Sequence, residues 1–133
     1  MRVIKVLVAL LATVTFFVLL AQTDADYMGW MKSAVASKGK VAKGIAAKDK
    51  GVATDAKVME DSFKGMEDYW TKKGVADATG FAKTARTASA DAAKAIAAGD
   101  FDAANAAMTT LGGTCGGCHM AHRAKGDSGF QIK

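Results

Sequence analysis

The 133-residue sequence contains no proline, only two cysteines and two histidines, and 8% aromatic residues. Because proline interrupts helices, its absence leaves helix formation open along the whole chain. No segment shows the strict apolar and polar alternation of a half-buried β-strand, which argues against a sheet-based fold. The lysines lack interleaved aromatic residues and a recognised motif, which argues against nucleic-acid binding. Both thiols and both imidazoles fall within residues 115–122, so ligand chemistry is concentrated in one short segment.

The N-terminal residues have the pattern of an export signal. Arg2 and Lys5 form a basic start, residues 6–21 are a continuous apolar run, and a small-residue cleavage motif ends at Ala25. We therefore expect residues 1–25 to be a signal peptide and residues 26–133 to form one periplasmic domain, without membrane association after cleavage. The alternative is an uncleaved anchor, although the run is shorter than the roughly 20 residues of a membrane-spanning helix.

Alanine makes up 15 of the 33 residues between positions 75 and 107. Since alanine has the highest helix propensity, this region is expected to be helical. Breaks are expected at residues 49–51, at Gly74 and at Gly99-Asp100, because Gly closes helices and Asp caps the next one. The four predicted helices are Asp26–Lys48, Ala53–Lys73, Asp77–Ala98 and Asp100–Lys125.

Apolar residues recur along each predicted helix at steps of three and four, the spacing of a bundle interior. The set in the first helix is Tyr27, Met31, Val35, Ala42 and Ile45, interrupted by Lys38. The set in the last helix ends with Cys115 and Cys118, so both thiols are expected to face the interior. Short breaks favour antiparallel neighbours, and the predicted fold is therefore an all-α, up-down-up-down four-helix bundle.

The segment Cys115-Gly116-Gly117-Cys118-His119 has the C-x-x-C-H spacing of a covalent c-type haem site. Two thiols at this spacing can each add to one vinyl group of the same porphyrin, and the adjacent imidazole then binds the iron. We expect one haem c per chain, attached to Cys115 and Cys118, with His119 as the proximal iron ligand. Because the core has few large residues, the haem-free protein is expected to be loose or unfolded.

Three alternatives compete with haem for this segment. A zinc site would use Cys115, Cys118, His119 and His122, but four side chains from one helix face could hardly surround a metal tetrahedrally. A thioredoxin-like redox pair requires a βαβ context. A disulfide that closes so short a loop would add little stability.

These features together resemble the cytochrome c prime family. The C-terminal match is the C-x-x-C-H segment with Arg123 four residues after its histidine, and the N-terminal match is Tyr27-x-x-x-Met31-Lys32. A departure is His122, where the family usually has Phe or Tyr. The resemblance implies haem bound between the helices of a bundle. It also implies electron transfer where a first-helix Met fills the sixth iron position, and binding of small gases where that position is open.

Met31 matches the methionine of the low-spin members, so the resemblance implies a periplasmic electron carrier with His119 and Met31 on the iron. The alternative for Met31 is ordinary core packing. Met28, three residues earlier, is the other candidate for the sixth iron position. If that position is open, the protein is five-coordinate and binds NO or CO. Arg123 is expected either to contact a haem propionate or to be a solvent-exposed cation. No distal acid–base constellation is evident, so we expect an electron-transfer protein rather than an enzyme.

Residues 26–50 hold six lysines against two aspartates. A solvated helix face is the ordinary explanation of such lysines, and docking to an acidic redox protein is the functional one. The family resemblance implies a homodimer through the first two helices, whereas the lysines there favour a monomer.

Overall fold

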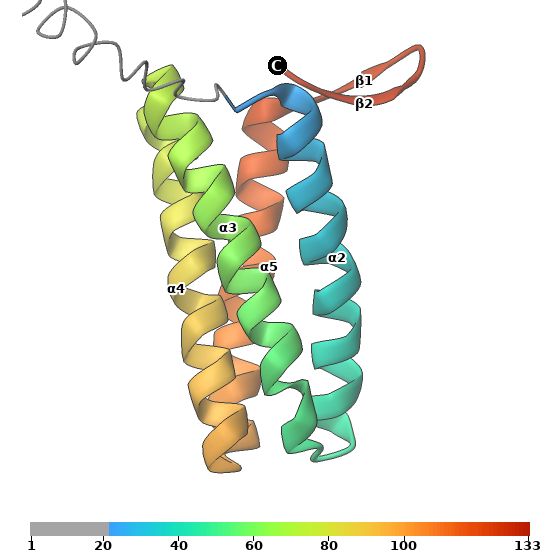
Figure 1. Cartoon of the computed structure of the whole chain (residues 1–133), viewed down its shortest axis with the longest axis vertical. Coiled ribbons are helices and arrows are strands. Elements are labelled where there is room, and N and C mark those ends of the chain that lie inside the picture. The colour runs from blue at the N-terminus through green and yellow to red at the C-terminus, as the bar shows by residue number, and fades with distance from the viewer. Residues whose placement is uncertain (1–21) are drawn as a thin grey trace, which may run out of the picture.

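Four long helices run side by side in alternating directions in the computed structural model, which describes residues 22–133 (Figure 1). They are α2 (Asp24–Ala46), α3 (Ala53–Lys73), α4 (Ala76–Ala98) and α5 (Phe101–His122). A short 3₁₀ helix, η1 (Lys50–Val52), joins α2 to α3. The expected arrangement of four packed helices is therefore observed. Residues 1–21 of the expected signal peptide lie outside the described residues.

Helix ends follow local hydrogen bonding. The Thr23 hydroxyl accepts a hydrogen bond from the Asp26 backbone N–H, and the Asp26 carboxylate accepts one from the Thr23 N–H. This capping box starts α2 at Asp24, two residues before the predicted start. Gly74 and Gly99 end α3 and α4 with φ of 71° and 80°, a conformation that glycine adopts without steric cost. The breaks predicted at these two glycines are confirmed.

The interior predicted for α3 is buried. Its members Ala56, Met59, Phe63, Met66 and Trp70 are at most 6% exposed. The buried residues of α4 and α5 are mainly alanine, with Ile96, Met108 and Leu111 as the largest. Within residues 22–133, no helix is both long enough and apolar enough to cross a membrane.

The interior predicted for α2 is partly wrong. Its buried residues are Tyr27, Ala34, Ser37, Val41 and Gly44, whereas Val35 is 59% exposed and Ala42 is also exposed. The helix packs mainly against α3 and has few contacts with α5. Its buried face is therefore turned toward α3, and Met31 and Val35 are left beside the space between α2 and α5.

The predicted end of the last helix at Lys125 is also wrong. α5 ends at His122, and β1 (Arg123–Gly126) pairs antiparallel with β2 (Gly129–Ile132). Gly126 and Gly129 flank a two-residue turn, and Gly129 has a φ of 120°, so glycine permits the reversal. Pairing of the two strands gives their backbone N–H and C=O groups hydrogen-bond partners. The last carbonyl groups of a longer, exposed helix would lack such partners. The hairpin projects from the end of the bundle where α5 ends and α2 begins (Figure 1).

Candidate functional site

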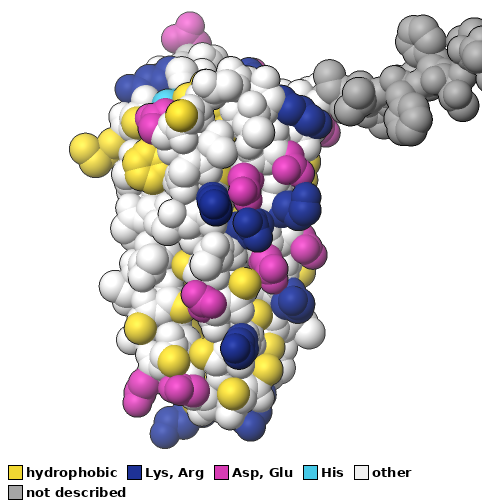
Figure 2. Space-filling view, turned by 90° about the vertical axis from the view of Figure 1, so that its left-hand side faces the viewer, with side chains coloured by type: hydrophobic (Ala, Val, Ile, Leu, Met, Phe, Trp, Pro, Cys, Tyr) yellow, Lys and Arg dark blue, Asp and Glu magenta, His cyan; other side chains and the backbone are white. Residues whose placement is uncertain are grey.

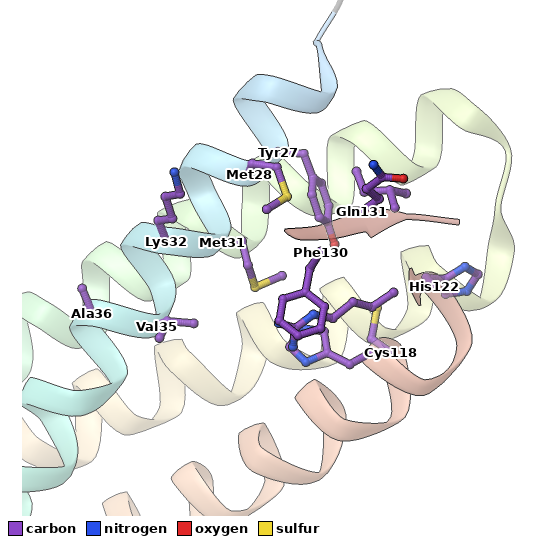
Figure 3. A pocket seen from close by; sticks show the side chains of 13 residues that line it. Tyr27, Met28, Met31, Lys32, Val35, Ala36, Cys118, His122, Phe130 and Gln131 are labelled. Carbon is purple, nitrogen blue, oxygen red and sulfur yellow. The ribbon is translucent and has the colours of Figure 1, made fainter. Parts of the chain in front are cut away.

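A cavity of about 440 Å³ lies between α2, the end of α5 and the hairpin (Figure 3). This volume falls in the range of roughly 300–1,000 Å³ that is typical of small-molecule and cofactor sites. Apolar side chains and sulfur atoms form much of the wall. The lining residues are Tyr27, Met28, Met31, Lys32, Val35, Ala36, Cys118, His119, His122, Arg123, Phe130, Gln131 and Ile132.

A second cavity, of about 30 Å³, lies toward the bundle interior, where Phe63, Met66, Trp70 and Phe81 form part of its wall. Four residues border both cavities, namely Tyr27, Met31, Cys118 and His119. Cys115 borders only the inner one. The residues shared by the two cavities form the partition between the outer cavity and the core.

The residues predicted to form the site therefore line two adjoining cavities. Met31 and His119 come from opposite ends of the chain, yet both border the two cavities, with Cys118 beside them. Arg123 and Met28 also line the outer cavity. In Figure 3 the Met31 side chain extends from α2 toward the α5 side of the cavity, where Cys118 lies.

Both cysteines are free thiols and are partly buried. Burial raises the pKa of the Cys118 thiol to about 11, and the nearby Cys115 and Asp77 act in the same direction. Burial also raises the pKa of Cys115, although the Lys38 charge opposes this shift. The two side chains are consequently protonated at neutral pH, and each presents an S–H group to the inner cavity.

The His119 imidazole is held in its neutral form. Burial is the largest cause of its lowered pKa, and the positive charges of Arg123 and Lys38 lower the pKa further. A neutral imidazole keeps a nitrogen lone pair available for a metal ion. His119 therefore has the protonation state that an iron ligand needs.

His122 is engaged elsewhere. Its Nε2 lies 2.8 Å from Oδ2 of Asp77, and its ring centroid lies 5.1 Å from that of Trp70. These contacts tie the end of α5 to the start of α4 and to the end of α3. Among residues 22–133, no group of three or more His, Cys, Asp or Glu side chains is arranged to hold a metal ion. Zinc bound by Cys115, Cys118, His119 and His122 is thus disfavoured, whereas haem iron needs only one or two protein ligands.

An aromatic cluster orients the start of α2. The Tyr27 ring lies 4.8 Å from Tyr69 and 5.6 Å from Trp70, measured between centroids. The Trp70 indole N–H donates a 3.2 Å hydrogen bond to the Tyr27 hydroxyl. Because the cluster packs α2 against α3 at this point, it sets the direction in which Met28 and Met31 face.

The glycines of the C-x-x-C-H region differ in what surrounds them. A Cβ placed on Gly117 would lie 2.9 Å from a ring atom of Phe81, so the missing side chain lets Phe81 approach the α5 backbone. Gly112, Gly113 and Gly116 have open space at the same position. The α5 backbone at these three glycines therefore has no neighbouring side chain of the described residues packed against it.

Three residues of the hairpin belong to the site but were not predicted from the sequence. Phe130, Gln131 and Ile132 line the outer cavity, and the Arg123 guanidinium carbon lies 3.3 Å from the Phe130 ring centroid. The Gly126-Asp127-Ser128-Gly129 turn was the available signal, because glycines around a two-residue loop are typical of a β-hairpin.

No protein-family model matches the chain, and neither a curated protein nor a solved structure matches it.

Proposed function

We propose that this chain is a monohaem c-type cytochrome that carries single electrons. The observation that supports this most strongly is the position of Met31, Cys118 and His119 around the same two cavities, with Cys115 on the inner one. A thioether, an imidazole and two thiols are the groups that a Met-ligated and His-ligated haem c requires.

Each residue has a separate role in this proposal. Cys115 and Cys118 would hold the haem covalently, each through a thioether formed by addition of its S–H group across one vinyl group. His119 holds the iron from α5 through its neutral imidazole, and Met31 from α2 through sulfur. Arg123 lies on the outer wall, where its charge is suited to a propionate. The bound haem supplies reversible one-electron exchange between ferric and ferrous iron.

The surrounding chain sets the conditions for that exchange. Methionine as an axial ligand raises the reduction potential. The apolar walls of the inner cavity would limit the contact of a bound iron with water, and burial and hydrogen bonds around the iron ligands would tune its potential further. Tyr27 and Trp70 maintain the position of α2 and thereby the reach of Met31.

The test is to produce the full chain together with a c-type haem attachment system. Mass spectrometry is expected to show one covalent haem, and Cys115→Ala/Cys118→Ala should abolish the attachment. The optical spectrum is expected to be low-spin with the far-red band of Met–iron ligation. Met31→Ala should convert the spectrum to high spin, and Met28→Ala is the matched control that should leave it low-spin.

Two results would contradict the proposal. A chain that acquires no covalent haem is not a c-type cytochrome. A high-spin wild-type spectrum with rapid CO binding would instead favour the five-coordinate gas-binding function and would remove Met31 from the iron.

A further inference from the structure

We propose that the face at the mouth of the outer cavity, formed by α2 and the hairpin, is the docking surface for an acidic electron-transfer protein. This mouth surface consists of Lys32, Val35, Arg123 and Phe130, all of which line the cavity. The inference rests on the proposed electron-carrier function and adds the place of docking and the charge of the partner.

The centre of the mouth surface is apolar and exposed. Val35 is 59% exposed and Phe130 is 55% exposed. Both border the cavity that holds His119 and Met31, so a partner seated on them would lie next to the proposed haem. Desolvated apolar centres with a polar, charged rim are the usual anatomy of protein interfaces.

The rim is positively charged. No carboxylate lies within ion-pair distance of Lys32 or Arg123 among residues 22–133. From Tyr27 to Ala46, α2 carries four lysines and no acidic residue. The acidic residues near this end of the bundle include Asp24, which contacts Tyr69 and Lys73, and Asp26 in the capping box. Asp77 lies beside His122, and Asp127 lies in the hairpin turn.

One side of the bundle carries charges of both signs. Figure 2 shows Lys or Arg and Asp or Glu side chains intermixed on the side that lies to the left in Figure 1. Three ion pairs on α3 and α4 neutralise charges there, namely Lys57–Glu60, Lys64–Asp68 and Arg86–Glu67. Within the described chain, Lys32 and Arg123 give the cavity mouth unpaired positive charge beside its apolar centre, and charge complementarity calls for a negatively charged partner.

A protein partner fits this surface better than a lipid membrane does. Membrane-surface helices expose a continuous apolar face, whereas Val35 is the only large apolar residue of α2, within the described chain, that is mostly exposed. A small apolar centre with a basic rim suits brief docking, which a one-electron carrier needs in order to release its partner.

The binding test uses ¹⁵N-labelled full-length protein and a decaglutamate peptide as the acidic probe. We expect amide shifts in residues 28–36 and 123–132 that decrease with added salt. Lys32→Glu should weaken peptide binding by about tenfold, the lower end of electrostatic enhancement, and Phe130→Ala should weaken it independently of salt. Lys83→Glu makes the same change of net charge on α4 and should leave binding unchanged. Lys32→Gln removes the charge without reversing it, so its loss of peptide affinity should be smaller than that of Lys32→Glu.

The redox test measures oxidation of the reduced holoprotein by hexacyanoferrate(III), an anion, and by tris(phenanthroline)cobalt(III), a cation. Lys32→Glu should slow the first reaction about tenfold and speed the second, with Lys83→Glu close to wild type. The two proposals can fail independently. Absence of covalent haem would contradict the proposed function, whereas the peptide titration does not require haem and would still test the docking surface.

Three results would overturn the inference. Equal effects of Lys32→Glu and Lys83→Glu would show that only net charge matters. Peptide shifts centred on residues 83–94 would place the acidic site elsewhere. Tighter binding of vesicles that contain phosphatidylglycerol than of the peptide, through the same residues, would identify a membrane as the occupant.

Discussion

Cys115 and Cys118 share a motif but have different surroundings. Cys118 borders the outer and the inner cavity, whereas Cys115 faces only the inner one. Their spacing could be read directly from the sequence. Their protonation state could not, because the pKa of a thiol depends on its burial and on charges from other helices. Asp77 at the start of α4 is one such charge for Cys118.

We expect the Cys118 thiol of the haem-free Cys115→Ser variant to be alkylated slowly at pH 8. Its rate should rise about tenfold per pH unit until the pH approaches the thiol pKa, since only the thiolate reacts. Iodoacetamide kinetics between pH 7 and 11 would measure this. The control is Ser128→Cys in a chain without the native cysteines, whose exposed thiol should level off near its ordinary pKa of about 8.5.

The same shift predicts the pH dependence of stability. The Cys118 pKa is raised above the ordinary value of a thiol, to about 11, in the folded chain. Between these values the native state holds more protons than the unfolded state, so the free energy of unfolding falls as pH rises through this window. If the alkylation rates of Cys118 and of the Ser128→Cys control had the same pH profile, the Cys118 thiol would not be desolvated.

At the scale of elements, close contact between α2 and α3 depends on a glycine. A Cβ on Gly65 would lie 2.5 Å from a ring atom of Trp30, so the Trp30 indole packs directly over the α3 backbone. The capping box of Thr23 and Asp26 fixes the beginning of α2. The Asp24 carboxylate also accepts a hydrogen bond from the Tyr69 hydroxyl and pairs with Lys73. Cleavage after Ala25 would remove Thr23 and Asp24 together with these contacts.

Gly65→Ala is expected to lower the free energy of unfolding by about 1–3 kcal/mol, the usual cost of overpacking. Gly80→Ala is the matched control on α4, where the new Cβ meets no atom within 4 Å. That change should raise the free energy of unfolding by roughly 0.5–1 kcal/mol through helix propensity. Urea denaturation followed by circular dichroism measures both. A stabilised Gly65→Ala variant would contradict the close packing of Trp30.

Thr23→Ala is expected to destabilise the protein by about 1 kcal/mol, because the N-cap hydrogen bond is lost. Thr84→Ala changes an exposed threonine inside α4 and should be neutral or slightly stabilising. Both variants are compared in a chain that begins at Gln22, again by urea denaturation. An equal effect of the two substitutions would mean that the cap contributes nothing.

At the scale of the whole molecule, the four helices are not packed equally. α2 is held mainly by α3, and the outer cavity separates much of its free side from α5. A group that fills this cavity and bonds to Met31 and His119 would join α2 directly to α5. Binding to the folded state alone stabilises a protein by mass action, and covalent attachment makes this stabilisation permanent.

We therefore expect the Cys115→Ala/Cys118→Ala chain to have a lower helix content and a lower, broader thermal transition than the holoprotein. Far-UV circular dichroism during heating tests this expectation. Ser128→Ala, in the exposed hairpin turn, is the control and should melt like the wild type. A haem-free variant with the full helix content and melting temperature of the holoprotein would show that the bundle is complete without the cofactor.

The sequence by itself determined the four helices and the spacing of Cys115, Cys118 and His119 along α5. Alanine-rich stretches, capping residues and closing glycines act over a few residues, so α3 was predicted with its observed bounds. The hairpin was missed because Arg123 to Lys125 can continue a helix, and only pairing with Gly129 to Ile132 makes the strand favourable.

Only the tertiary structure decided how α2 is rotated, and with it the positions of Met31 and Val35. The pattern of α2 allows more than one buried face, and the choice among them depends on packing against Trp70, Tyr69 and Gly65 of α3. The meeting of Met31 with His119 follows from that choice. Local chemistry could name each residue, but their proximity required the packed bundle.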